Sequence, residues 1–392
     1  MYKGLILILL ISMPVYAQEI TDFNTVDSMS YAYYQSNNWD ELIRFGKEAN
    51  ANKVDFKRLQ QRMGYAYFSK ADYYNAIKHY ENSLSFDQTD EISHLYLYYA
   101  GLNIGDESFA RYHAGKISTE MKSENKIKAF RPVDALDFEY NYKMNNTELR
   151  SNPNYIRLGV NTQIGYRLNL YQTVSRYNQI SVYNSGTTYQ YTADTEQDEY
   201  FALLSWSVLS KTNLSVGYHA VNAKVDYGTT SAVYPGKIWL GNIHQKISRI
   251  DFGLNGSVFS NDSVKTTQIG MQIGIALPGK CSPYLRSTVY NINEYDENRI
   301  VFSQMAGMFV YRKLWVEASV KLGNLNNFVD LNGLYFYNSP DQTTFRTGIS
   351  LFWFQNRHLT VYTNYLFDKK QIYQTLNKYN QHSISGGIIW KI

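Results

Sequence analysis

The chain has 392 residues, enough for two or three domains, and its net charge of +4 is too small to indicate a nucleic-acid partner. Although 44% of the residues are hydrophobic, no run approaches the ~18 consecutive apolar residues of a membrane-spanning helix. The single cysteine, Cys281, excludes an internal disulfide and a metal site built from several thiolates. Tyrosine occurs 37 times, and it is favoured in strands and at membrane interfaces.

The first residues have the pattern of a secretory signal peptide. Lys3 supplies the positive charge, residues 4–12 form the apolar core, and Ala17 ends a small-residue cleavage site before Gln18. We therefore expect residues 1–17 to be removed and the mature chain to leave the cytoplasm.

A helical domain with an internal repeat is predicted for residues 18–130. Residues 57–90 carry small and aromatic residues at the spacing of a tetratricopeptide repeat, and a shift of 34 residues aligns alanines of neighbouring units. The outer units, 23–56 and 91–122, match less well, as terminal repeats do. A generic helical bundle is the alternative. Small residues let two helices cross closely and aromatic rings fill the groove, so the expected packing residues are Gly64, Tyr67, Ala76, Tyr80 and Ala110.

Residues 131–392 alternate apolar and polar side chains, which is the two-residue period of a β-strand. The alternation runs in segments of about ten residues. In the first segment, Leu136, Phe138 and Tyr140 share one face and Asp137 and Glu139 the other. This length fits the ~9–11 residues of a tilted strand crossing a bilayer. Tight turns alternate with longer polar loops, as in outer-membrane barrels. The pattern predicts a transmembrane antiparallel β-barrel, with a soluble β-sandwich as the alternative.

The number of strands follows from which connections are short and which are long. Long loops are expected at 144–153, 179–197, 226–236 and 369–381. Keeping both ends of the barrel on one side of the membrane gives about 14 strands, with 12 or 16 as alternatives. This count requires residues 314–337 to form one long strand that rises above the membrane.

The last residues of the chain carry a further signal. Gly387, Trp390 and Ile392 stand at the spacing of the C-terminal signal of outer-membrane proteins, which they resemble except that Ile392 replaces the usual phenylalanine. Such a signal is read by the barrel-assembly machinery. The resemblance implies insertion into outer-membrane lipid and pairing of the last strand with the first, because an open edge in lipid leaves backbone groups unpaired.

The polar face of the strands is expected to line the lumen. A barrel of ~14 strands is too wide to be filled by its own side chains, so the lumen should hold water, a plug or folded loops. A strongly selective pore would show a ring of one sign. The inward charges instead have mixed signs, which suits ion pairs or a weakly selective wet pore; they are Arg157, Asp251, Glu317, Lys321 and Arg346.

Catalytic chemistry finds little support in the sequence. His219 shares a polar strand face with Ser215, but no acidic or amide partner is visible at the right period. There is no nucleophile elbow, zinc-protease motif or phosphate loop. The acidic run at 192–200 is compatible with Ca²⁺ but is better explained as a solvated loop face. We therefore predict no catalytic, cofactor-binding or metal-binding residue, and a lipid-modifying enzyme ranks third among the functions.

The order of signal peptide, short tetratricopeptide-like array and C-terminal barrel resembles the YaiO-type outer-membrane proteins. In plan it is also similar to the export porins for cellulose and poly-N-acetylglucosamine, and the Tyr- and Asn-rich strands look like those of Bacteroidetes outer-membrane proteins. The resemblance implies a Gram-negative outer membrane with the helical domain in the periplasm. Our first hypothesis is a non-enzymatic anchor or scaffold whose repeats bind an envelope protein. The alternative is a channel that exports polysaccharide or passes small solutes.

Overall fold

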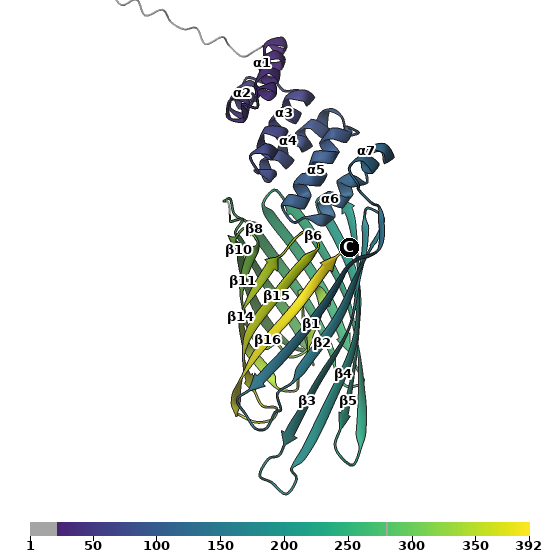
Figure 1. Ribbon diagram of the computed structural model, residues 1–392. Coiled ribbons are helices and arrows are strands. Elements are labelled where there is room, and N and C mark those ends of the chain that lie inside the picture. The colour runs from purple at the N-terminus through teal and green to yellow at the C-terminus, as the bar shows by residue number, and fades with distance from the viewer. Residues whose placement is uncertain (1–21, 280) are drawn as a thin grey trace, which may run out of the picture. The chain divides into compact units, whose positions relative to one another are not determined.

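The computed structural model describes residues 22–279 and 281–392, so the predicted signal peptide, residues 1–17, lies outside the described residues. The chain forms two compact units, one ending at Ile104 and the other spanning Gly105–Ile392. Figure 1 labels their helices and strands. The predicted domain boundary lies between residues 130 and 131, and the first strand begins at Phe130.

The first unit consists of five helices in the part of the chain that is described. Helices α1, α3 and α5 begin at residues 23, 57 and 91, and thus 34 residues apart. Aspartate or asparagine side chains cap α1, α2, α4 and α5 at their first turns. Within residues 22–279 and 281–392 no helix has the length and hydropathy needed to cross a membrane. The helices are α1 (Phe23–Gln35), α2 (Trp39–Ala51), α3 (Lys57–Ser69), α4 (Tyr73–Phe86) and α5 (Glu91–Asn103).

Four of the five expected packing residues belong to α3 and α4. A Cβ atom at Gly64 would stand 2.9 Å from the Tyr80 ring, so a glycine lets α3 and α4 approach closely. Ala76 is fully buried, and the Tyr67 ring stacks on His79 with centroids 5.2 Å apart. Ala110 is also fully buried, but it belongs to α6 in the second unit.

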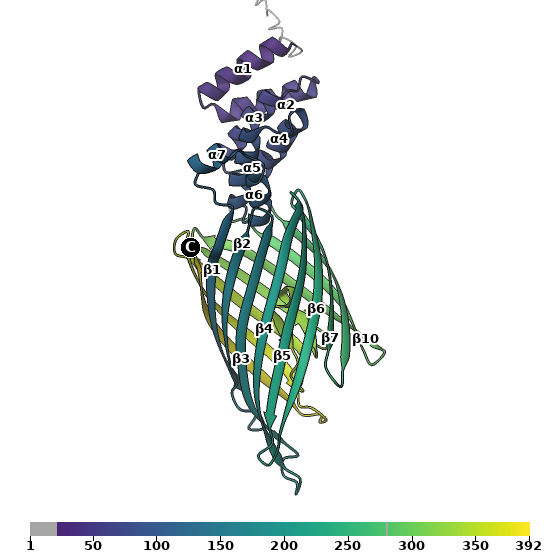
Figure 2. The same ribbon diagram turned by 90° about the vertical axis from the view of Figure 1, so that its right-hand side faces the viewer.

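The second unit contains α6 (Glu107–Ala114), α7 (Thr119–Glu124) and a closed antiparallel barrel (Figure 2). Among the described residues the barrel has 14 strands, which confirms the predicted count and excludes 12 or 16. Each strand pairs with its neighbours, and β1 pairs with β16 to close the barrel. The strands are β1 (Phe130–Asn145), β2 (Asn154–Ile164), β3 (Leu168–Tyr183), β4 (Tyr191–Leu209), β5 (Thr212–Asp226), β6 (Ser231–Ile247), β7 (Ile250–Ser260), β8 (Lys265–Ala276), β9 (Tyr284–Glu294), β10 (Glu297–Tyr311), β11 (Leu314–Leu322), β14 (Gln342–Phe354), β15 (Leu359–Gln371) and β16 (Lys378–Lys391).

We call the end where β1 begins and β16 ends the terminal end, and the opposite end the loop end. The long loops predicted at 179–197 and 226–236 are mostly strand, and this part of the prediction is wrong. Strands β3 and β4 stay paired as far as Tyr183 and Tyr191. The polar sequence there marks exposed strand and not loop, because a hydrogen-bonded ladder can extend into water without an apolar face.

The outer face of the barrel is apolar and much of the inner face is polar, the reverse of a soluble protein. Outward-pointing Trp239 and Met271 are 64% and 67% exposed, whereas inward-pointing Ser383 and Ser385 are each 1% exposed. Trp390 and Ile392 are exposed as well. Gly387 faces the lumen, where the Tyr362 ring occupies the space that a side chain at this position would need. This arrangement suits a barrel surrounded by lipid and not a soluble sandwich.

We predict that acid destabilises the helical unit through His79. Burial lowers the pKa of this imidazole to about 4, and its Nδ1–H donates to Gln60 Oε1 at 2.6 Å. The unfolded histidine has the higher pKa and binds more protons between these values, so stability is present at neutral pH and is lost as pH falls from about 6.5 to 4, by up to about 3 kcal/mol.

The measurement is urea unfolding of the helical circular-dichroism signal of the full-length protein at several pH values. The variant His79→Gln should flatten the pH dependence between pH 6.5 and 4. An equally steep dependence in this variant would show that another group is responsible.

The barrel lumen as candidate functional site

The connection between β11 and β14 folds into the lumen, so the predicted single strand over 314–337 is wrong. Strand β11 ends at Leu322, and Gly323 adopts a φ of +120° at a point where a Cβ atom would collide with the Ile300 carbonyl oxygen. Only glycine fits this turn. Strands β12 (Phe328–Asp330) and β13 (Tyr335–Tyr337), joined by the short helix η1 (Leu331–Gly333), then pair with each other. We call residues 323–341 the lumen hairpin.

Apolar side chains of the hairpin pack against one wall of the barrel. Val329 and Phe336 belong to a buried cluster supplied by β4, β5, β6 and β7, and Leu325 and Phe328 belong to a second cluster supplied by β9 and β10. On these strands the inward positions near the hairpin are apolar, contrary to the expected polar lumen. In the sequence, these wall residues could have been found because the strands that carry them have apolar residues on both faces. The wall residues are Phe201, Val221, Ile238, Leu240, Phe259, Tyr290, Ile292 and Val301.

Polar groups of the wall hold the hairpin backbone. The Gln268 amide donates to the Val329 carbonyl at 2.8 Å and accepts from the Val329 N–H at 3.1 Å. His219 Nδ1 donates to the Gly333 carbonyl at 2.8 Å, and its Nε2 lies 3.2 Å from Glu199 Oε2. The expectation that His219 has no acidic partner is therefore wrong, because Glu199 comes from the neighbouring strand β4. This histidine anchors the hairpin.

Two ion pairs fix the hairpin at different depths. Lys321 Nζ lies 2.8 Å from Asp330 Oδ2, and both side chains are buried. Near the loop end, Arg150 donates two hydrogen bonds to Asp341, at 2.7 and 2.8 Å, and the Tyr379 hydroxyl donates to the same carboxylate at 2.8 Å. Paired, hydrogen-bonded charges of this kind tolerate burial that an isolated charge does not.

The structure places the other predicted lumen residues in separate polar groups. Arg157 lies 2.8 Å from Glu139, which also accepts from Tyr335 of the hairpin at 2.6 Å. Arg346 binds Asp368 through two hydrogen bonds, at 2.6 and 2.7 Å.

Glu317 and Asp251 make mainly neutral contacts. Glu317 accepts from the Trp315 indole N–H at 2.9 Å and from the Tyr284 hydroxyl at 3.2 Å. Asp251 accepts from Gln272 at 3.1 Å and lies 3.8 Å from His244. Together the predicted charges line the lumen wall, but they do not converge on one centre.

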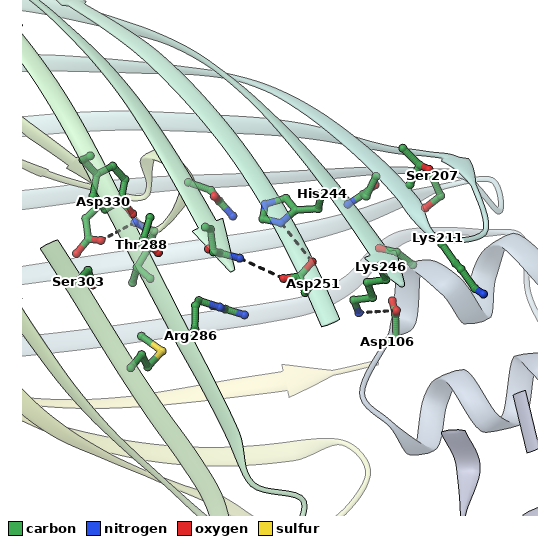
Figure 3. A pocket seen from close by; sticks show the side chains of 18 of the residues that line it. Asp106, Ser207, Lys211, His244, Lys246, Asp251, Arg286, Thr288, Ser303 and Asp330 are labelled. Atoms are coloured by element: carbon green, nitrogen blue, oxygen red, sulfur yellow. Dashed lines mark hydrogen bonds and ion pairs between the residues drawn. The ribbon is translucent and has the colours of Figure 1, made fainter. Parts of the chain in front are cut away.

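Cavities remain beside the hairpin, and two of them are lined by residues of the barrel and the hairpin. The larger, of about 650 Å³, runs along β1, β2 and β14–β16 and is rich in tyrosine. The smaller, of about 270 Å³, contains His244 pointing toward Asp251, and Lys246 whose Nζ lies 2.5 Å from Asp106 (Figure 3). Within residues 22–279 and 281–392, no group of three or more His, Cys, Asp and Glu side chains is arranged to hold a metal ion. The packed hairpin thus fills part of the lumen and leaves cavities beside it.

No protein-family model matches the chain, and no curated protein matches it. Similar solved structures include the P. putida toluene transporter TodX, with a TM-score of 0.46 and 7% identity over 67% of this chain and 91% of that one. The monoaromatic hydrocarbon channel CymD has a TM-score of 0.42 and 9% identity over 72% and 91%. A bacterial polysaccharide outer-membrane secretin has a TM-score of 0.42 and 7% identity over 67% and 99%. At this level of similarity none of them assigns a cargo to this chain.

We predict that Lys321→Met loosens the lumen hairpin. The substitution leaves the buried Asp330 carboxylate without its cation, which should cost about 3–5 kcal/mol of hairpin stability. Hydrogen exchange of residues 328–337, followed by mass spectrometry on the full-length protein, should become markedly faster. The double variant Lys321→Met with Asp330→Asn should recover much of the protection, because it removes both charges. Unchanged exchange in Lys321→Met would contradict the role assigned to the ion pair.

Proposed function

We propose that this protein is an outer-membrane barrel with a narrowed lumen that binds and passes small polar solutes. The apolar outer band with exposed Trp239 and Met271 supports insertion into lipid. The C-terminal strand with Gly387 and Trp390, followed by Ile392, supports delivery by the barrel-assembly machinery. In this proposal the terminal end faces the periplasm, where the helical unit lies, and the loop end faces the outside.

The observation that carries the proposal is the division of the lumen. The hairpin rests on the wall formed by β4–β10 through buried apolar contacts, which makes it a fixed part of the barrel. The opposite side keeps a tyrosine-lined cavity of about 650 Å³. This volume suits a ligand of a few hundred daltons, whereas the hairpin takes up space that a bulky polymer would need. The narrowed lumen therefore favours small solutes over polysaccharide export.

The finer features of the resemblance are part of the same proposal. Helix starts spaced by 34 residues, with Gly64 against Tyr80, support a tetratricopeptide-like array. The order of array and barrel supports a YaiO-type layout. We also propose that the chain is not an enzyme, since His219 is occupied by the hairpin carbonyl and Glu199.

The test is single-channel conductance of the full-length protein in planar bilayers. We expect a small, steady conductance from the unmodified protein. Replacing residues 324–340 by a short Gly-Ser linker should raise the conductance severalfold, because it empties the wall side of the lumen. Shortening the exposed connection 184–190 at the same end of the barrel is the matched control and should change little.

Equal conductance of the unmodified and linker proteins would show that the hairpin does not narrow the lumen. An absence of conductance in both would contradict the channel and favour the anchor.

A second role, binding of an envelope protein by the repeats, is favoured by a specific surface. Tyr34, Tyr65 and Tyr96 come from α1, α3 and α5, and their rings touch in series with centroids 5.3 and 5.5 Å apart. All three are partly exposed. A continuous aromatic strip over successive repeats is a suitable contact for a partner chain, since aromatic side chains dominate interface energies.

We predict that a photo-crosslinking amino acid at Tyr65 or Tyr96 captures a discrete partner in living cells. The same residue at Lys78, an exposed position of α4, is the control and should not. Capture of the same partner from all three positions, or from none, would argue against the aromatic strip as the binding surface.

A further inference from the structure

Two lysines that line the larger lumen cavity have no acidic partner in the part of the chain that the structure describes. Four other cations line this cavity, and each has a carboxylate within 2.5 to 2.8 Å: Arg157, Lys321, Arg346 and Lys391. Lys143 on β1 and Lys370 on β15 also line it, yet neither forms an ion pair among residues 22–279 and 281–392. The difference singles out these two side chains.

The nearby acids are already occupied. Asp368 receives two hydrogen bonds from Arg346, and Asp341 receives two from Arg150. Lys370 is only 8% exposed, and its single described contact is a long one, 3.5 Å to the Ser339 hydroxyl. Lys143 Nζ lies over the Tyr177 ring, 5.2 Å from its centroid. A buried ammonium group without a counter-charge is costly, so a negative ligand group would be strongly favoured here.

The two lysines belong to one region of the lumen wall. Both strands that carry them pair with β16, Lys143 opposite Ser383 and Lys370 opposite Tyr379. Both side chains line the same cavity, together with Tyr177 and Gln197. A ligand in this part of the cavity can therefore meet both ammonium groups.

An independent observation points to the rest of the ligand. Asn141 lies two residues before Lys143 on the same inward face and is 6% exposed. Its Nδ2 donates to Ser385 Oγ at 2.6 Å, while its Oδ1 has no hydrogen-bond partner among the described residues. Buried polar atoms normally have partners. A hydroxyl group on the ligand would supply the missing donor.

We propose that the cavity binds a small hydroxylated organic anion. Its carboxylate or phosphate lies between Lys143 and Lys370, and one of its hydroxyl groups donates to Asn141 Oδ1. The tyrosine rings beside the cavity provide flat surfaces for the carbon skeleton. This site deepens the proposed function, on which it rests for its role in transport, by naming the chemical class of solute.

The experiment is isothermal titration calorimetry on the full-length protein in a non-ionic detergent. The probes are glucuronate, glucose 6-phosphate and glucose, which share a hydroxylated ring and differ in charge. We expect the two anions to bind about tenfold more tightly than glucose, or better, because charge-assisted hydrogen bonds are stronger than neutral ones. Binding of only one anion identifies the charged group, carboxylate or phosphate, that the site takes.

The double variant Lys143→Gln with Lys370→Gln should weaken anion binding by about tenfold or more. Lys265→Gln, which removes the same charge from an exposed position at the start of β8, should bind like the unmodified protein. Asn141→Leu should weaken the binding of both anions severalfold. Heat-modifiable electrophoretic mobility checks that each variant forms the barrel.

Glucose binding as tight as that of the anions, no anion binding at all, or full affinity in the folded double-lysine variant would overturn the site. The conductance test separates this outcome from the proposed function. A protein that binds anions but never conducts has the site and is not a channel, whereas one that conducts without binding anions is a channel without this site.

Discussion

A barrel of 14 strands encloses more volume than its own side chains can fill, and this constraint shapes the rest of the molecule. The two sides of the lumen are filled to different extents. One wall turns apolar side chains such as Phe201 and Ile238 inward, and the lumen hairpin packs against them as a small hydrophobic core. The other wall keeps polar and aromatic side chains around a cavity. By filling part of the lumen in this way, the hairpin leaves less open space inside the barrel.

The hairpin is held by two kinds of contact, nondirectional apolar packing and directional hydrogen bonds. Apolar packing of Phe328 and Phe336 supplies stability without direction, while the Gln268 amide on the Val329 backbone fixes one position along the wall. In the ion pair of Lys321 with Asp330, each buried charge is neutralised by the other, so neither is left unpaired in the interior. The position of the hairpin and its stability thus depend on different residues, so a substitution can weaken one without the other.

The strands were predictable because the outer face of the barrel is apolar, and their number because short and long connections alternate along the chain. Outward residues such as Trp239 and Met271 are apolar, so the two-residue period is visible in the sequence. The hairpin was not predictable in this way. Its strands β12 and β13 contain strand-forming side chains, and residues 323–327, with positive φ at Gly323 and Asn327, separate β11 from β12. Helix spacing in the first unit was readable because its repeat length of 34 residues recurs.

The lumen was only partly predictable, because pairing across strands depends on register. The mixed signs of Arg157 and Arg346 suggested ion pairs, but the partners Glu139 and Asp368 are defined by neighbouring strands. The same limit hid Glu199 beside His219. Once each buried cation is matched with its carboxylate, the informative residues are the cations without a match. Carboxylates of the protein neutralise most of the cations that line the larger cavity. Lys370 is buried and has no ion-pair partner among the described residues, so it marks where the protein leaves neutralisation to a ligand.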